Sequence, residues 1–268
     1  MIETLRVIWR HRTLIWRLAQ RETEARFRGS LLGIIWVALV PLIMLAVYSL
    51  VFGSILNAGW HSPTAGQAQE FSFSMLIFIG LTLFGVLAET INRSPSLILE
   101  NPSYVKKVTF PLQILPVVAL LSTLINAAVS LAIFFIFYLF MYGLPNESVL
   151  YLPAVIFPFV LLCLGASYFL ASLGVFLRDM KHVTGPVTTA LMFLSPVFYA
   201  PDNLPENYRQ LLYLNPVTPV VIQARDVIFW GRAPSPLEWG AYMVVALLIY
   251  ALGSAWFQRT HKAFADVI

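Results

Sequence analysis

Six long apolar stretches, almost free of charged side chains, constrain the fold of this chain more than any other feature. A helix needs about 20 apolar residues to cross the hydrocarbon core of a bilayer, which is about 30 Å thick. Helix is required because lipid offers no hydrogen-bond partner to backbone amides and carbonyls. Membrane β-strands are about ten residues long and alternate in polarity, unlike these stretches. The predicted spans are residues 31–56, 71–92, 112–143, 149–177, 183–201 and 239–257.

The composition supports an all-α integral membrane protein. Charged residues make up 11% of the 268 residues, against about 25% in soluble domains. So few charges cannot cover a water-facing surface, and part of the surface must therefore meet lipid. We expect a single six-span transmembrane domain over residues 31–268, preceded by a cytoplasmic segment over residues 1–30.

Positive charges alternate between successive connections, which indicates the orientation in the membrane. Seven arginines precede the first span, and Lys or Arg also occupies the second and fourth connections and the C-terminal tail. The first and third connections hold none. The fifth holds Arg209, Arg225 and Arg232, but the other 14 of the 17 basic residues lie on the opposite side. Because Lys and Arg concentrate in cytoplasmic loops, both termini are predicted to be cytoplasmic.

The segment before the first span has the pattern of a basic amphipathic helix. Over residues 3–21 most arginines gather in one sector of a helix, and leucine, isoleucine and tryptophan fill most of the rest. Such a helix beside a span is typical of the membrane interface; the alternative is packing against a soluble partner. Its basic face predicts contact with anionic headgroups, either of bilayer lipid or of a substrate. The candidate headgroup contacts are Arg6, Arg10, Arg17, Arg26 and Arg28.

The sequence carries none of the motifs expected of an enzyme or a self-powered pump. It has no GxxxxGK[ST] phosphate-binding motif, and its cytoplasmic carboxylates are too dispersed for a Mg²⁺ site. We therefore predict no catalytic residue, metal or cofactor in this chain, and its net charge of +4 is not a nucleic-acid signature. Glu89 and Arg93, one turn apart at the end of a span, are interpreted as a local ion pair. Energy for any uphill transport must come from a partner.

Residues 100–116, ENPSYVKKVTFPLQILP, separate two apolar runs with two lysines and three prolines. Asn followed by Pro favours the start of a helix, and the residue before a proline avoids helical backbone. The pattern predicts a short rigid helix that docks into a groove on a soluble partner. The alternative is a lipid-facing loop with lysines at the headgroups. The candidate docking residues are Asn101, Pro102, Tyr104, Val105, Lys106, Lys107 and Phe110.

Four stretches resemble one family of transporters. In chain order they are RETEARFRGSLLGIIWVALVPL, NPSYVKKVTFPLQILP, FVLLCLGASYFLASLGVFLRDMKHV and LMFLSPVFYAPDNLPENYRQLLYLNPVTPVVIQARDVIFWG. They are similar to the permease subunits of type-2 ABC exporters of bacterial polysaccharides, most of all in the O-antigen and teichoic-acid branch. The capsule-exporting branch has a different N-terminal sequence, so the resemblance to it is weaker.

The resemblance implies a homodimeric channel in the cytoplasmic (inner) membrane, joined to two ATP-binding-cassette subunits that use ATP and Mg²⁺. The cargo would be a lipid-linked polysaccharide such as O-antigen. Residues 101–110 would be the coupling helix seated on the ATPase, with Arg178 and Asp179 at the second cytoplasmic loop. Residues 203–232 would be re-entrant outer helices that gate the exit, which suits an apolar stretch interrupted by prolines. Candidate channel and gate residues are Phe193, Phe198, Tyr199, Tyr213, Asn215 and Arg225.

Three other functions remain open on the sequence. An exporter of the same class could carry capsule, teichoic acid, a drug or a simple lipid. A membrane-embedded glycosyl or prenyl transferase is the second, although the acidic metal site that it needs is missing. The third is a structural subunit without a transport path, which the docking segment disfavours.

Overall fold

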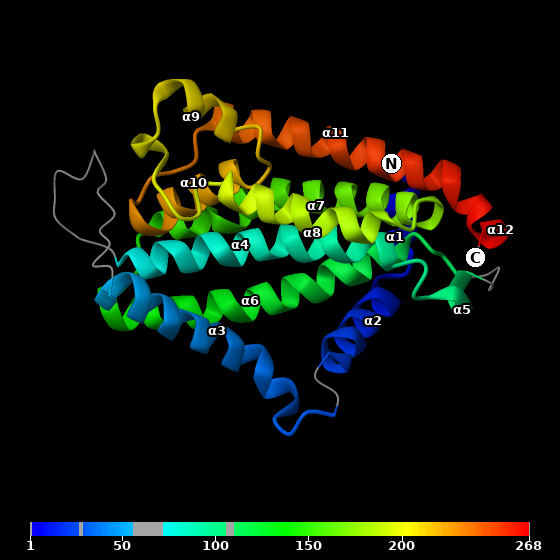
Figure 1. Ribbon diagram of the computed structural model, residues 1–268, viewed down its shortest axis with the longest axis horizontal. Helices are drawn as coiled ribbons and strands as arrows, with labels where there is room; N and C mark the ends of the chain where they lie inside the picture. Colours follow the sequence, from blue (N-terminus) through cyan, green and yellow to red (C-terminus); the bar gives the residue numbers. More distant parts are fainter. Residues whose placement is uncertain (1, 27–28, 56–71, 106–109, 268) are drawn as a thin grey trace.

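The protein is a bundle of helices. The computed structural model describes residues 2–26, 29–55, 72–105 and 110–267, and within them it contains no β-strand. Four long helices lie side by side along the longest axis, with both chain ends at one end of the bundle (Figure 1). They are α4 (Phe73–Arg93), α6 (Ile114–Tyr142), α7 (Leu152–Phe176) and α11 (Pro236–Thr260). The predicted all-helical fold is confirmed.

Five helical segments among the described residues are long and apolar enough to cross a membrane. The first joins α3 (Trp36–Tyr48) to a π-helical stretch, Ser49–Ile55. The five segments are Gly33–Ile55, Phe73–Ser96, Ile114–Tyr142, Glu147–Phe176 and Pro236–Ala263. They include short 3-10 turns at Gly33–Ile35, Ser94–Ser96, Glu147–Tyr151 and His261–Ala263. Five of the six predicted spans therefore have a helix of sufficient length.

The predicted fifth span is shorter than the sequence indicates. α8 (Met180–Phe193) has 14 residues, about 21 Å of helix, whereas the apolar run continues to residue 201. Beyond α8 the chain turns, because Arg225 donates hydrogen bonds to the carbonyls of Pro196 and Val197 at 2.5 and 2.8 Å. Val197 is fully buried. The apolar character of residues 195–200 thus reflects burial or partial burial within the protein rather than a longer helix.

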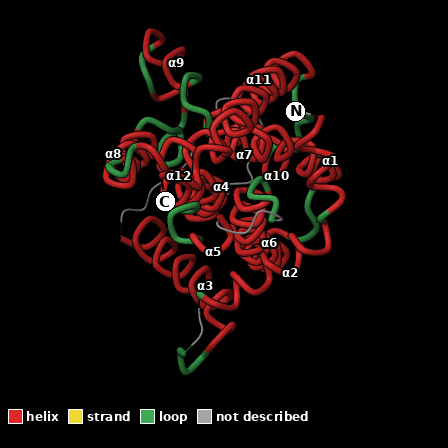
Figure 2. Tube along the Cα trace, turned by 90° about the vertical axis from the view of Figure 1, so that its right-hand side faces the viewer, coloured by secondary structure: helices red, strands yellow, loops and turns green. Residues whose placement is uncertain are grey.

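The connection between α8 and α11 contains two helices. α9 (Glu206–Leu212) follows a 3-10 turn at Pro201–Asn203 and is largely exposed. α10 (Thr218–Phe229) is buried along most of its length and contacts α4 and α7. Figure 2, which looks along the bundle, places α4 near the middle and α3, α8 and α9 at the margin.

Two glycines let α7 and α11 approach at backbone distance. A Cβ atom placed on Gly165 would lie 2.5 Å from the Tyr250 Cα atom, and one placed on Gly253 would lie 2.0 Å from the Gly165 carbonyl oxygen. Side chains normally keep helix axes 8–10 Å apart, and small residues allow closer packing in membranes. These two glycines therefore determine how closely the two helices pack.

The amphipathic N-terminal segment is two helices, α1 (Ile2–Arg10) and α2 (Arg12–Ala25). Ile15 and Ala19 of α2 are buried against Ile114 and Val118 of α6. The Thr23 and Ser122 hydroxyls share a hydrogen bond of 3.1 Å. Part of the apolar face of α2 thus packs on the bundle itself, while Trp9 and Trp16 remain exposed; the interfacial position of this segment stays a prediction. The last helix, α12 (Phe264–Val267), packs against α7.

Candidate coupling site

The helix of the docking segment begins at Pro102, as the sequence suggests, and hydrogen bonds attach it to the turn before it. α5 (Pro102–Val105) is one helical turn. The Asn101 carbonyl accepts hydrogen bonds from the Tyr104 and Val105 amides, and its side-chain amide donates to the Leu97 carbonyl at 2.9 Å. The Asn101 side chain therefore binds the preceding turn rather than the amides of α5. Lys106 and Lys107 lie outside the described residues.

The apolar side chains of this segment face the protein. The Val105 side chain is buried. Tyr104 and Phe110 are half-buried and stack on each other, with ring centroids 4.3 Å apart and planes 9° apart. Pro102 and Ser103 are exposed. The three apolar residues expected to contact a partner thus hold the segment in place, and Pro102 and Ser103 present its outer surface.

The turn before the docking segment is fixed to α7 by backbone packing. A Cβ atom on Gly174 would lie 2.0 Å from the Pro95 carbonyl oxygen. The hydroxyl of Ser94, the residue before Pro95, donates to the Ser167 hydroxyl of α7 at 2.8 Å. Both serines are buried. The turn that leads into the docking segment therefore packs on α7 backbone to backbone, with no side chain between the two.

Two ion pairs and one hydrogen bond attach α2 to the same region. Arg26 pairs with Glu89, and Arg93 pairs with Glu22. Arg21 donates to the Tyr104 hydroxyl at 3.5 Å. The predicted local pair between Glu89 and Arg93 is therefore wrong: each residue pairs across to α2. The spacing within α4 pointed to a neighbour on the same helix, whereas the approach of α2 cannot be read from local spacing.

Most of the other predicted cytoplasmic residues lie on the surface. Arg178 and Asp179 are exposed in the turn between α7 and α8. Arg6, Arg10 and Arg17 are exposed on α1 and α2 and are available to lipid or substrate. Of the other two candidate headgroup contacts, Arg26 is engaged by Glu89 and Arg28 lies outside the described residues.

Arg225, expected at the outer gate, is buried at the opposite end of the bundle. Only 1% of its surface is exposed. Besides Pro196 and Val197, it donates to the Leu76 carbonyl at 2.8 and 3.2 Å. Gly80 of α4 leaves room for it, since a Cβ atom there would lie 2.8 Å from the guanidinium. Arg225 thus joins α10, α4 and the turn after α8.

The other candidate channel residues surround that turn. The rings of Phe193 and Phe198 lie 6.3 Å apart, and the Tyr199 hydroxyl donates to the Phe193 carbonyl at 3.2 Å. The Asn215 amide donates to the Leu191 carbonyl at 2.7 Å, which satisfies an acceptor near the end of α8. Tyr213 stands apart from them in the wall of a separate pocket. Phe193 and Tyr213 are exposed, so both are free to contact another molecule.

The fold and this site define a class of protein: a multi-pass helical membrane protein with a short helical segment clamped at one end between membrane helices. The chain belongs to the ABC-2 type transporter family, whose model matches residues 13–229. This confirms the family expected from the sequence.

Similar proteins of known name cover nearly the whole chain. It is 27% identical to the O-antigen export system permease protein RfbA of Myxococcus xanthus over the full length of both chains. It is 20% identical to the protein of the same name from Klebsiella pneumoniae over 94% of this chain and 93% of that one. It is 24% identical to the polysialic acid transport protein KpsM of Escherichia coli over 91% of this chain and 92% of that one.

Proposed function

We propose that this chain is the membrane subunit of an ABC transporter that exports a lipid-linked, O-antigen-like polysaccharide across the cytoplasmic membrane. The relatives named for O-antigen export support the cargo. The observation that carries the proposal is the clamped docking segment, because a chain without an ATP-binding motif needs a rigid point at which a partner can apply force. ATP and Mg²⁺ would bind that partner, and this chain would have no catalytic site of its own.

The distribution of positive charge supports the orientation, with both termini in the cytoplasm of the inner membrane. The basic helices α1 and α2, the docking segment and the C-terminus lie at one end of the bundle (Figure 1). Arg225 lies in a connection that this orientation places outside, so its positive charge was an exception to the pattern in the sequence. Because its guanidinium is buried on backbone carbonyls, it is not a free surface charge that would hold this end in the cytoplasm.

Two copies of this chain with two ATP-binding subunits would form the complex. α3 and α8 support a homodimer, because each leaves many of its apolar side chains exposed. Val47 of α3 and Phe193 of α8 are examples, 43% and 64% exposed. A second copy would cover these helices and enclose a path between the subunits, and Phe193 and Phe198 would offer aromatic faces to sugar rings. In a monomer, α3 and α8 would face lipid and would not enclose a path.

The contacts of the docking segment suggest how ATP hydrolysis would move the membrane helices. Closure of the two ATP-binding subunits would push on Pro102 and Ser103. The backbone contact between Pro95 and Gly174 would pass that displacement to α7. The bond from Arg21 to Tyr104 and the pair of Arg93 with Glu22 would carry it to α2. Both helices would then move with the ATPase.

The exposed arginines would handle the charged end of the cargo. Arg6, Arg10 and Arg17 can approach a pyrophosphate at the membrane surface, or anchor α1 and α2 on anionic lipid. At the opposite end, residues 203–232 would form the re-entrant exit segment, with Tyr213 on its surface and Arg225 as its internal anchor. Loss of export without loss of membrane insertion, on replacing the three arginines together, would favour substrate handling.

The similarity to KpsM supports one alternative within the same class. That relative is named for polysialic acid transport and covers almost as much of the chain. Capsule, teichoic acid, drug or simple lipid export would use the same fold and the same docking segment. Detection of the exported polymer in cells that carry only this transporter distinguishes these cargoes.

Co-purification with the ATP-binding subunit encoded beside this chain tests the proposal. We expect Ser103→Trp to abolish co-purification, because Ser103 is exposed on the outer surface of α5. Ser235→Trp, an exposed serine at the opposite end, is the matched control and should bind normally. Tyr104→Ala with Phe110→Ala should also lose binding by releasing the segment. Unchanged binding by Ser103→Trp moves docking to residues 178–182, and the absence of any ATPase partner rejects the proposed function.

A further inference from the structure

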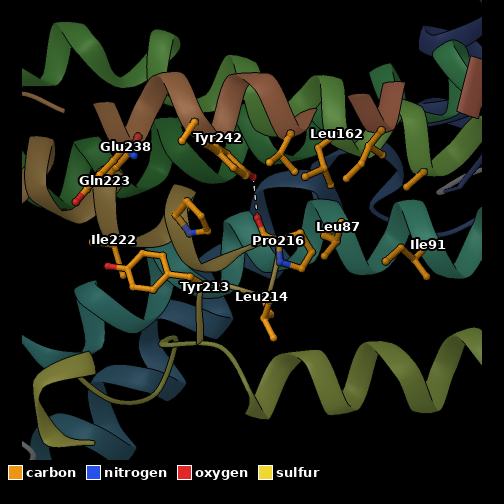
Figure 3. A pocket seen from close by; sticks show the side chains of 15 residues that line it. Leu87, Ile91, Leu162, Tyr213, Leu214, Pro216, Ile222, Gln223, Glu238 and Tyr242 are labelled. Carbon is orange, nitrogen blue, oxygen red and sulfur yellow. Dashed lines mark hydrogen bonds between the residues drawn. The ribbon is translucent and has the colours of Figure 1, made fainter. Parts of the chain in front are cut away.

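A cavity of about 510 Å³ lies beside α11. Figure 3 shows side chains from α4, α7, α10 and α11 and from the chain before α10 around it. Most of its wall is apolar, with Leu87, Ile91, Leu162 and Ile222 among the lining residues. Its volume falls within the range of small-molecule sites, about 300–1,000 Å³. None of the described residues of the docking segment lines it.

Two hydrogen-bond acceptors of the cavity lie at one end. Gln223 and Glu238 lie at the end away from Ile91 (Figure 3). Gln223 is 4% exposed, and its Oε1 atom has no hydrogen-bond partner within the described chain. Glu238 is exposed and forms no salt bridge with any described residue. An amide oxygen and a carboxylate both accept hydrogen bonds, so the group that they lack is a donor.

The cavity has the dimensions and polarity of a lipid site. Its lining residues on α11 run from Glu238 to Ile249, eleven residues that span about 16 Å along the axis. Glu238 lies in the first turn of the helix that begins at Pro236. The polar end of the cavity is therefore at a membrane surface, and the apolar end lies at the depth of the hydrocarbon core. The Tyr242 hydroxyl donates to the Pro216 carbonyl at 2.7 Å and joins two of the walls.

We propose that this cavity holds one acyl chain of a bilayer phospholipid whose headgroup carries a primary ammonium. The ammonium donates to the Glu238 carboxylate and to Gln223 Oε1, and the acyl chain lies along α11 toward Ile249. An ammonium has three donors and no acceptor, which matches a pair of acceptors of which one is negatively charged. The site does not depend on the proposed cargo or on the ATPase.

The headgroup, not the chain, decides which lipid binds. Lipid tails are as apolar as the leucine and isoleucine side chains that line the cavity, so a tail has little to gain by leaving the bilayer. An ammonium meets opposite charge at Glu238, whereas an anionic headgroup without an ammonium meets like charge. The same repulsion disfavours the pyrophosphate end of a lipid-linked glycan. The pocket therefore selects a bilayer lipid over the proposed cargo.

Photocrosslinking of the transporter complex in vesicles tests the site. The probes are phosphatidylethanolamine and phosphatidylglycerol with the same diazirine-bearing acyl chain, and labelled peptides are mapped by mass spectrometry. We expect phosphatidylethanolamine to label residues 241–249 at least five-fold more than phosphatidylglycerol does. Glu238→Gln, at an exposed position, should reduce that preference below two-fold. Glu147→Gln, an exposed carboxylate that does not line the cavity, should leave it unchanged.

A second pair of variants tests the chain rather than the headgroup. Ala241→Phe fills the cavity from α11 and should remove labelling by both lipids, whereas Val244→Phe, on the same helix but outside the cavity, should not. Equal labelling by both lipids, unaffected by Ala241→Phe, would show only boundary lipid and overturn the site. Equal labelling that Ala241→Phe removes would overturn the ammonium. Displacement of the label by an isoprenoid phosphate, but not by unlabelled phosphatidylethanolamine, would assign the cavity to the cargo instead.

Discussion

The segments that contain α3 and α4 are both apolar and long enough to span a bilayer, yet they differ strongly in how much of each is buried inside the protein. Of the most apolar 18 residues of each, 6% are buried in the first segment and 67% in the second. The α3 segment is the more hydrophobic of the two by mean hydropathy. Apolar character therefore shows that both helices are removed from water, by lipid or by protein. It does not show which of them the chain covers with its own side chains.

Polar and backbone contacts distinguish the two helices. α4 accepts a buried arginine at the Leu76 carbonyl, and its Asn92 side chain hydrogen-bonds Thr188 of α8 at 3.2 Å. Its far end continues into the turn packed against Gly174. In α3 only Leu45 is buried. α4 with α7, α10 and α11 thus forms a fixed unit, while α3 presents a surface to lipid or to another copy.

Arg225 gives the most severe test of the fixed unit. Arg225→Met should lower the free energy of unfolding by about 3–5 kcal/mol, because it leaves the buried carbonyls of Leu76, Pro196 and Val197 without their charged donor. Loss of folded protein in fluorescence-detected size-exclusion chromatography is the expected readout. Arg209→Met is the control. Its guanidinium also donates to backbone carbonyls, those of Leu204 and Asp202, but it is partly exposed, and its pair with Asp202 is worth about 0–1 kcal/mol. Equal behaviour of the two variants would contradict the assigned role of Arg225.

The glycine contact between α7 and α11 should be almost as sensitive. Gly253→Ala places a methyl group 2.0 Å from the Gly165 carbonyl oxygen, and the two helices must separate. We expect a loss of about 3 kcal/mol, at the upper end of typical overpacking costs, measured as a lower midpoint of thermal unfolding in detergent. Gly240→Ala makes the same change on the same helix with nothing within 4 Å. It should be neutral or stabilising by about 0.5–1 kcal/mol; equal losses would mean that the contact is not tight.

The ion pairs between α2 and α4 should have a smaller effect that can be rescued. Arg93→Glu repels Glu22, and we expect about 1 kcal/mol of destabilisation because both side chains remain partly exposed. Glu22→Arg combined with Arg93→Glu should restore both stability and ATP-driven export. High salt should weaken the effect of the single variant, since exposed charges are screened. If the double variant is no better than the sum of the single ones, the pair does not couple the helices.

The sequence predicted what depends on local pattern and missed what depends on which helices become neighbours. Apolar length predicted five helices of membrane length, and Asn101-Pro102 predicted where the docking helix begins. Glu89 and Arg93 were assigned to each other because helical spacing is visible in a sequence, whereas the approach of α2 is not. Arg225 shows the same limit. Nothing in its neighbourhood along the chain indicates that the carbonyls of Leu76, Pro196 and Val197 will surround it.

The smallest expected effect on stability, that of a substitution in α3, gives the most direct comparison of α3 with α4. Ile43→Ala in α3 and Ile79→Ala in α4 remove the same atoms from side chains that are 44% and 0% exposed. In the isolated subunit Ile43→Ala should change stability by less than about 0.5 kcal/mol, whereas Ile79→Ala should cost about 2–5 kcal/mol through the cavity that it leaves. Thermal unfolding of both variants in detergent measures this. Repeating it on the assembled complex adds a further distinction: a cost for Ile43→Ala that appears only there means that α3 is covered by another copy, and an unchanged value means that lipid covers it.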